Sequence, residues 1–326
     1  MIYIENYSMD PFFNFALEYY IMHELDLDND VFLFWRTEPT LMIGRNQNTA
    51  EEINSVYVKE KNIHVVRRIT GGGTIYTDPG GWQFSFIIKG RPHSEIDFKI
   101  YTKPILDALN DLGINAYFSN RNDLLIDGRK FSGNAQCSTS KCILHHGSIL
   151  FDTDLEALVR ALTVADDKII SKGIKSVRQR VTNVIEHMEH KPSSLEFRDI
   201  MLDYLLKNTS GTYVLQPADL QRIDAIANEK FRQWQWNYGK SPKFQITKSN
   251  RFAGGKIEVN LNIYEGRIQD SMIYGDFFTH RDIDDVTKAL IGCPYKEEDI
   301  RKALENINAS EYFYLITLDE LISCII

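Results

Sequence analysis

Cysteine and long apolar runs are scarce in this 326-residue chain, and each shortage excludes a class of protein. The four cysteines are scattered, with no Cys-x-x-Cys pair, so neither a disulfide framework nor a zinc cluster is expected. No apolar stretch approaches the ~20 residues that cross a membrane. The first five residues, from Met1 to Glu5, contain no basic segment, so we expect no signal peptide. These absences predict a protein of a reducing cytoplasm that is not in a membrane.

Several familiar site motifs are also missing. The net charge of −8 gives no overall attraction for nucleic acid. No G-x-x-x-x-G-K-[ST] segment is present, which excludes a P-loop protein. The glycines at 71–73 do not continue as G-x-G-x-x-G, because Tyr76 stands where the last glycine would be, so a Rossmann site is not predicted. The absence of His-Glu-x-x-His excludes a zinc protease of that type, and the absence of G-x-S-x-G excludes a typical α/β-hydrolase.

What remains predicts two domains of the α+β class. The length favours two units, and 43% hydrophobic residues supply a sizeable core. The segment 238–250 reads as a boundary, because Gly239 and Pro242 break the preceding helix and a new alternating pattern follows. We therefore expect a large domain over 1–243 and a small one over 248–326. In the small domain, a hairpin over 257–274 should precede short helices near 282–291, 296–306 and 317–325.

Local signals place elements of the large domain. Asp10 before Pro11 predicts the start of an amphipathic helix over 11–25. We expect strands over 31–36, 40–44, 63–68, 82–89 and 143–151. Thr102 reads as the cap of a helix that Gly113 ends. Asp127-Gly128 predicts a tight hairpin turn. Further helices are expected near 154–163, 195–207 and 219–234.

The run Arg67–Tyr76 is the most informative segment of the chain. Two arginines lead into three glycines between β-prone segments. Bare backbone weakens a sheet unless an anion or another group must approach the N–H groups closely. Arginine adds a planar fork that fits phosphate or carboxylate oxygens. A β-bulge beside a surface arginine pair is the alternative. Period-two alternation would turn Arg68 toward the site and Arg67 away from it.

Three further segments combine positive charge with glycine or a strand end. Gly44–Asn48 follows an apolar strand, where a turn is the simpler interpretation. Lys130 comes just after the hairpin turn, although most lysines are solvated surface residues. Lys172–Arg180 is a basic loop, which alone would be a solvated face.

Taken together, these segments resemble one family, the lipoate–protein ligases. The match runs through nearly the whole chain, and its motifs occur in a joint order that chance does not explain. The family is related to biotin protein ligases and to the core of class II aminoacyl-tRNA synthetases. It therefore implies a mixed, mainly antiparallel sheet with flanking helices and a small α+β C-terminal domain. The resemblance is carried by Ile43–Gln47, Arg67–Tyr76, Asn122-Asp123, Asp127–Ala135, His145–Leu150 and Lys172–Arg178.

The resemblance implies a reaction in two steps. Lipoate attacks the α-phosphate of ATP to give lipoyl-AMP and pyrophosphate, and a lysine of a carrier protein then takes the lipoyl group. The expected carriers are lipoyl domains of 2-oxoacid dehydrogenase complexes or the glycine cleavage H protein, and the enzyme is expected to be a monomer. Mg²⁺ should accompany ATP. Loop 172–180 should close over the adenylate.

The family's site residues transfer to matching positions. Lys130 matches the catalytic lysine that contacts both lipoate and ATP. Asp123 is the candidate Mg²⁺ ligand. The expected ATP-binding residues are Arg45, Arg68, Gly73, Thr74, Ile75, Tyr76 and Lys130. The expected lipoate-binding residues are Arg68, Gly71, Gly72, Lys130 and His146. Departures from the family pattern at Thr74, Thr77 and Gly81 place any side-chain contact from the missing histidine and asparagine in doubt.

Two other functions stay open at this point. An ATP-independent lipoyl or octanoyl transferase of the same fold would move an acyl group between carrier proteins, and some such enzymes use a cysteine nucleophile, for which Cys137 and Cys142 are candidates. A non-catalytic module that senses lipoate would keep the pocket without turnover. A biotin ligase is not favoured, because no G-R-G-R-x-G segment is present.

Overall fold

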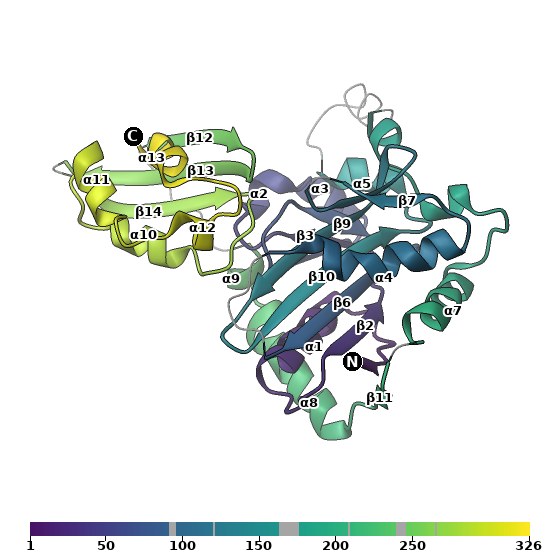
Figure 1. The fold of residues 1–326 in the computed structure, drawn as a ribbon. Helices are drawn as coiled ribbons and strands as arrows, with labels where there is room; N and C mark the ends of the chain where they lie inside the picture. The colour runs from purple at the N-terminus through teal and green to yellow at the C-terminus, as the bar shows by residue number, and fades with distance from the viewer. Residues whose placement is uncertain (91–95, 120, 163–175, 208, 239–245, 265) are drawn as a thin grey trace.

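An eight-stranded sheet forms the centre of the computed structural model, which describes residues 1–326 except 91–95, 120, 163–175, 208, 239–245 and 265 (Figure 1). The strand order is β11-β1-β2-β6-β10-β9-β8-β7. Only β1 pairs in parallel, with β2 and β11, and the other pairs are antiparallel. The strands are β1 (Ile2–Ile4), β2 (Val31–Trp35), β6 (Gly81–Lys89), β7 (Ala116–Phe118), β8 (Asp123–Ile126), β9 (Arg129–Ser138), β10 (Cys142–Leu150) and β11 (Thr212–Tyr213). The mixed, mainly antiparallel α+β prediction is confirmed.

Helices cover both faces of this sheet, so its central strands are buried throughout. Phe32 and Phe34 of β2 join the core under α4 (Phe98–Asp111) and α7 (Ser194–Leu205). Val31, Leu33 and Trp35 of the same strand join the core under α1 (Pro11–His23) and α8 (Pro217–Ile226). Successive side chains of a strand point to opposite faces, which explains why one short apolar strand feeds two cores.

A second, small sheet positions the glycine run. Its order is β4-β3-β5, with β3 (Thr40–Ile43), β4 (His64–Arg67) and β5 (Ile75–Thr77). It has its own apolar cluster, to which α3 (Ser55–Glu60) and α5 (Leu155–Leu162) contribute. Strand β4 runs parallel to β3 while β5 runs antiparallel to it, so the chain between β4 and β5 must cross over the end of β3. The remaining short helices described in the large domain are α2 (Thr49–Glu52), η1 (Val184–His187), η2 (Ala227–Phe231) and α9 (Trp234–Asn237).

The C-terminal domain is a three-stranded antiparallel sheet with helices packed on it (Figure 1). Its core is separate from the cores of the large sheet. The elements are β12 (Ile246–Phe252), β13 (Gly255–Tyr264), β14 (Arg267–Gly275), α10 (Asp284–Leu290), α11 (Glu297–Ala303), α12 (Ala309–Tyr312) and α13 (Leu318–Ile325). The predicted hairpin is present, but β12 and α12 were not predicted. The bounds 1–243 and 248–326 stay a prediction, since residues 239–245 lie outside the described part.

Two helix predictions in the large domain were wrong in detail. Helix α4 begins at Phe98, because Asp97 caps it by accepting from the N–H groups of Lys99 and Ile100. Thr102 lies inside the helix, and its hydroxyl donates to the carbonyl of Phe98 instead. The expected helix 219–234 is divided into α8, the π-helical η2 and α9. No helix among the described residues is both long and apolar enough to cross a membrane.

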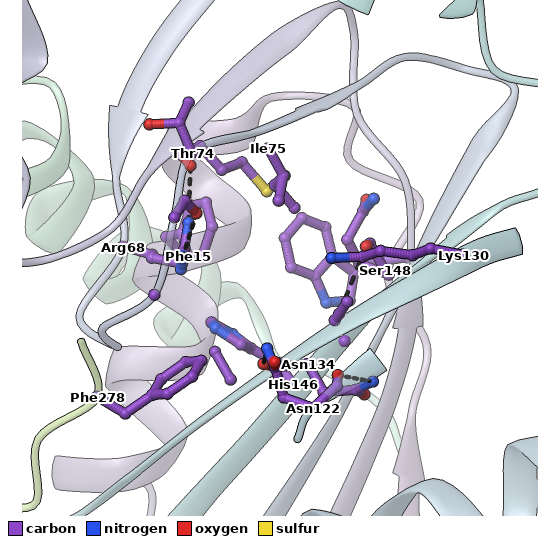
Figure 2. Close-up of a pocket in the computed structure, with 18 residues that line it drawn as sticks. Phe15, Arg68, Thr74, Ile75, Asn122, Lys130, Asn134, His146, Ser148 and Phe278 are labelled. Carbon is purple, nitrogen blue, oxygen red and sulfur yellow. Dashed lines mark hydrogen bonds between the residues drawn. The ribbon is translucent and has the colours of Figure 1, made fainter. Parts of the chain in front are cut away.

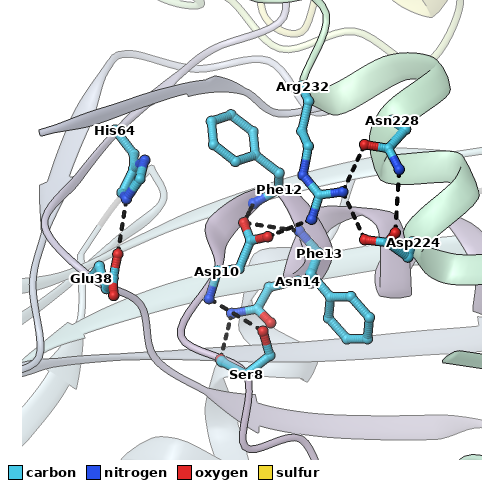
Figure 3. Close-up of polar contacts among 10 residues, drawn as sticks. All are labelled: Ser8, Asp10, Phe12, Phe13, Asn14, Glu38, His64, Asp224, Asn228 and Arg232. Carbon is cyan, nitrogen blue, oxygen red and sulfur yellow. Dashed lines mark hydrogen bonds and ion pairs between the residues drawn. The ribbon is translucent and has the colours of Figure 1, made fainter.

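Asp10 ties the first helix to the end of η2 (Figure 3). One carboxylate oxygen accepts from the N–H groups of Phe12 and Phe13, at 2.8 and 3.3 Å. The other accepts from Arg232 at 2.6 Å, and Arg232 also reaches Asp224 at 2.7 Å. A single side chain therefore serves as helix cap and as a link between segments over two hundred residues apart in sequence.

We predict that Asp10→Ala lowers the free energy of unfolding by about 1–2 kcal/mol, since it removes a cap worth ~1 kcal/mol and a partly exposed ion pair. Asp10→Asn keeps a capping oxygen and should cost less than half as much. Glu38→Gln breaks the exposed pair with His64 and is the matched control (Figure 3). Urea unfolding measures all three, and equal losses for Asp10→Asn and Asp10→Ala would contradict a capping role.

Candidate active site

Arg67 fixes the turn that follows β3. Its guanidinium donates to the carbonyls of Gly44, Arg45 and Gln47, at 2.9, 3.0 and 2.7 Å. It also donates to the hydroxyl of Thr49 at 2.6 Å. Arg67 is therefore a structural residue of the small sheet, as its predicted orientation away from Arg68 suggested.

Arg68 holds the glycine loop, which we define as residues 68–74. Its guanidinium donates to the carbonyls of Gly71 and Gly73, at 2.9 and 2.7 Å, and to that of Met42 at 2.7 Å. Its Nε donates to the hydroxyl of Thr70 at 3.1 Å. Burial lowers the pKa of Arg68 to about 10, so the side chain is still charged at neutral pH. The hydrogen bonds to the guanidinium come from backbone carbonyls and the Thr70 hydroxyl, while the charge of Glu18 acts on it from a distance.

The glycines allow the C-terminal domain to approach this loop. A Cβ at Gly71 would lie 2.4 Å from the carbonyl oxygen of Phe277, which is too close for any side chain. Gly72 has φ +95, and its N–H donates to that same oxygen at 3.2 Å. The bare backbone predicted for an anion is thus also required for contact between the two domains.

A cavity of about 120 Å³ lies between the glycine loop, α1, β9 and β10 (Figure 2). Apolar side chains form much of its wall, namely Phe15, Trp35, Met42, Ile75, Ala135 and Phe278. Polar groups gather along the rest, namely Arg68, Thr74, Gln83, Asn122, Lys130, Asn134, His146 and Ser148. Apolar walls with a few directed polar groups are typical of sites for small organic ligands.

Lys130 supplies the ammonium of this cavity. It lies near the start of β9, and Figure 2 shows its side chain reaching into the cavity beside Ser148. Its Nζ pairs with Asp123 on neighbouring β8 at 2.7 Å. A Cβ at Gly133 would lie 3.0 Å from that Nζ, so this glycine leaves room for the lysine to cross the strand. The hairpin turn at Asp127-Gly128 therefore places a cation and its carboxylate partner on adjacent strands.

His146 belongs to a buried polar chain that reaches the glycine loop. Its Nδ1 lies 3.0 Å from Glu18 of α1, and its Nε2 lies 2.7 Å from the Thr70 hydroxyl. Glu18 also accepts from Ser85 at 2.6 Å, which accepts from Trp35 at 2.9 Å. Because an ionised carboxylate only accepts, the contact with Glu18 assigns the ring proton to Nδ1. This chain holds the imidazole and the Trp35 ring in fixed positions at the wall, with the Thr70 hydroxyl behind them as a link to the glycine loop.

His145 points to the other face of the sheet, as strand alternation requires. It is fully buried among aromatic rings, with the Tyr101 centroid 5.1 Å and the Phe98 centroid 6.0 Å away. Neither ring nitrogen has a hydrogen-bond partner among the described residues. Burial holds the pKa of His145 well below its usual value, so the ring stays neutral. Of the paired histidines, only His146 lines the cavity.

The cavity brings together most of the predicted site residues. Arg68, Gly72, Gly73, Thr74, Ile75, Lys130 and His146 all line it. Gly71 faces the C-terminal domain, Tyr76 lies in the core of the small sheet, and Asp123 pairs with Lys130 without lining the cavity. Arg45 lies in a different cleft, where it pairs with Asp282 of the C-terminal domain at 2.7 Å. Val66 of β4, which precedes the two arginines, is buried in the core under α1.

Phe15, Trp35 and Phe278 were missed by sequence reasoning. Alternation along β2 and the apolar stripe of α1 mark Trp35 and Phe15 as core residues, and a pocket wall gives the same pattern. Phe278 comes from another domain, so no local pattern connects it with the cavity. Residues 172–175 of the predicted closing loop lie outside the described residues.

The donor set near Lys130 does not fit a metal ion held by the protein. Asp123 is engaged by an ammonium at 2.7 Å, which opposes a cation at the same oxygens. The described residues contain no group of three or more His, Cys, Asp or Glu side chains arranged to hold a metal. The pairing with Lys130 does not support the predicted role of Asp123 as an Mg²⁺ ligand, and no step below depends on it.

The cavity combines apolar walls with the ammonium of Lys130, which is the pattern of a site for a small organic ligand. Comparison with known proteins gives the family. Residues 10–206 match the lipoyl protein ligase A/B catalytic domain, and residues 241–325 match the bacterial lipoate protein ligase C-terminus. The lipoate-protein ligase of Bacillus subtilis (strain 168) is 42% identical over 100% of both chains, and lipoate–protein ligase 1 of Staphylococcus aureus is 38% identical over 99% of both. The chain belongs to the lipoyl protein ligase A/B family.

Solved structures agree with this placement. The crystal structure of P. falciparum LipL1 in complex with lipoate has a TM-score of 0.77 and 25% identity, and the match covers 94% of each chain. An ATP-bound lipoate-protein ligase A has a TM-score of 0.59 and 21% identity over 73% of this chain and 97% of that one. At this identity the second likeness shows the fold alone.

We predict that His145→Phe removes part of the acid sensitivity of the fold. Below pH 6.5 the unfolded chain gains a proton on His145 while the folded chain does not, so native stability falls as pH falls. When the pH falls from 7.5 to 5.5, the free energy of unfolding of the parent protein should drop by about 1.4 kcal/mol more than that of the variant. Urea unfolding at both pH values measures this difference, and equal losses in the two proteins would contradict the neutral buried state.

Proposed function

We propose that the protein is an ATP-dependent lipoate–protein ligase. The observation that carries the proposal is the ammonium of Lys130, which reaches into a cavity with apolar walls beside the glycine loop. A medium-length acyl group fits the apolar part, and its carboxylate fits the cationic end. The relatives that are lipoate–protein ligases, and the two solved structures with bound lipoate and bound ATP, support the same substrates.

In the first step, an oxygen of the lipoate carboxylate forms a bond to the α-phosphorus of ATP. The bond from that phosphorus to the bridging oxygen breaks, and pyrophosphate leaves with the electron pair. Two anions must meet for this reaction, so a preorganised cation at the meeting point lowers the barrier. Lys130 supplies that cation. The Asp123 carboxylate holds the ammonium in place before the substrates bind.

The glycine loop supplies the surface on which the adenylate lies. Arg68 draws the carbonyls of Gly71 and Gly73 toward itself, so the loop is fixed before a nucleotide binds. Thr74 and Ile75 continue the wall, and the Thr74 hydroxyl is held by Gln47 at 2.9 Å. We assign Gly73, Thr74 and Ile75 to the nucleotide, and Gly72 and His146 to the acyl chain. Gly71 belongs to the loop but faces the C-terminal domain, and Arg45 and Tyr76 lie outside the cavity.

In the second step, the neutral ε-amine of a carrier lysine attacks the carbonyl carbon of lipoyl-AMP. The carbon–oxygen bond to AMP breaks, the amine loses its proton, and a lipoyl amide remains. We propose lipoyl domains of 2-oxoacid dehydrogenase complexes or the glycine cleavage H protein as carriers. One solved structure of the family is described with its E2 lipoyl domain. We further propose that the enzyme works as a cytoplasmic monomer and takes Mg²⁺ together with the phosphates of ATP.

A cysteine-dependent transferase is less consistent with the site. Burial raises the pKa of Cys137 to about 12, so its thiol is protonated and a poor nucleophile at neutral pH. Cys142 is buried in the core under α1. Within the described part of the chain, neither sulfur belongs to the cavity wall.

We predict that Lys130→Ala severely slows adenylate formation while the fold stays intact. Loss of one preorganised electrostatic contact should reduce the rate about 10²–10³-fold. The measurement is lipoate-dependent exchange of labelled pyrophosphate into ATP. Arg129→Ala is the control, because the neighbouring cation pairs with Glu186 at 3.5 Å and does not line the cavity. Normal exchange in Lys130→Ala would remove this residue from the mechanism.

We also predict that Cys137→Ala and Cys142→Ala retain lipoyl transfer to a carrier domain within about twofold of the parent rate. Neither thiol touches the cavity, so each change affects packing only. Transfer is measured by mass spectrometry of the carrier, with thermal unfolding as the check on folding. A loss of transfer together with a trapped acyl-cysteine in the parent protein would establish the transferase instead.

A further inference from the structure

One wall of the cavity comes from the C-terminal domain. Phe278 follows β14 and is only 1% exposed, yet it does not belong to the core of its own domain. It packs instead with Ile96, Phe98 and Ala135 of the large domain. Figure 2 shows its ring among the cavity residues, on the opposite side from Lys130. Because the ring packs against the other domain, the stability of its own sheet does not explain its burial.

Phe277, the adjacent residue, provides an internal comparison. It is equally buried, but it lies in the core of the C-terminal domain with the Phe313 centroid 5.0 Å away. Of these two adjacent rings, Phe277 therefore points into the core of the C-terminal domain, and Phe278 points toward the large domain. Only Phe278 lines the cavity.

The position of the Phe278 ring is fixed by contacts on several sides. Phe98 packs against it edge-on, with centroids 5.4 Å apart, and the guanidinium of Arg121 lies 5.6 Å from its centroid. A Cβ at Gly72 would lie 2.8 Å from its ring, so the glycine makes room for it. The domains are further joined by a hydrogen bond of 2.6 Å from Arg121 to the carbonyl of Gly254.

The ring therefore lies between the glycine loop and β9. The glycine loop carries the proposed adenylate surface, and β9 carries Lys130. Ala135, which it contacts, pairs directly with His146 on β10. A smaller side chain at 278 would leave open the space between Gly72 and Ala135. A larger one has nowhere to go, because Phe98 and Gly72 already confine the ring.

We propose that Phe278 is a specificity-determining residue, a wall supplied by the C-terminal domain that limits how bulky an acyl group the cavity accepts. This inference rests on the proposed ligase function. It makes the C-terminal domain part of the acyl-binding site. Binding of the acid is thereby coupled to the docked position of that domain.

The test compares acids of different bulk in the pyrophosphate exchange assay. The acids are lipoate, octanoate and 8-phenyloctanoate, and the proteins are the parent, Phe278→Leu and Phe278→Ala. Tyr314→Ala is the matched control. Tyr314 belongs to the same domain and packs on the same Phe98, with centroids 6.2 Å apart, but it does not line the cavity.

For Phe278→Ala we expect the kcat/KM ratio of lipoate over 8-phenyloctanoate to fall about tenfold or more, since apolar pockets discriminate by roughly 10–200-fold. Phe278→Leu should lie between the parent and Phe278→Ala. The KM for ATP should stay within twofold in both variants, and Tyr314→Ala should keep the parent ratio. Thermal unfolding identifies a variant that does not fold, in which case Phe278→Leu carries the comparison.

An unchanged acid ratio in the folded Phe278 variants, with normal lipoate-dependent exchange in the parent, would overturn this inference alone. The same change in Tyr314→Ala would also overturn it, because the effect would then belong to domain packing in general. Absence of lipoate-dependent exchange in the parent protein would instead refute the ligase function.

Discussion

Two adjacent arginines, Arg67 and Arg68, are buried at the end of β4. Among the described residues, no carboxylate forms an ion pair with either guanidinium. Burying such a charge is costly unless hydrogen bonds surround it. Here the backbone supplies them, with carbonyls of the turn after β3 around Arg67 and carbonyls of the glycine loop around Arg68. The loop cannot move away without leaving a buried cation unsatisfied. This constraint keeps the loop in one shape, and the cavity depends on that shape.

Hydrogen bonds connect this loop to both domains. The Thr70 hydroxyl connects Arg68 with His146 and so with Glu18 of α1, which links the small sheet to the large one. On its other side, the loop meets the carbonyl of Phe277, which links it to the C-terminal domain. The glycines thus have two roles. They leave backbone free on the cavity side, and they permit close contact on the domain side.

Much of the fold follows from local chemistry that is visible in the chain. The capped helix at Asp10, the hairpin at Asp127 and the strand β2 depend on short-range signals, so they were predicted correctly. Thr102 was misassigned because a threonine can cap a helix or donate to the preceding turn, and only the position of Asp97 decides between them. Strand β12 was missed because its residues are largely exposed and polar, which gives no alternating apolar pattern.

The candidate site divides in the same way. The sequence by itself determined the glycine run, the lysine one residue past a tight turn and the opposite orientation of two adjacent histidines. Each depends on spacing within a few residues. Only the tertiary structure decided that Arg68 binds its own loop, that Asp123 pairs with Lys130, and that Phe278 closes the cavity from another domain. Alternation along a strand states which face a side chain takes, but the partner on that face is chosen by packing between segments far apart in the chain.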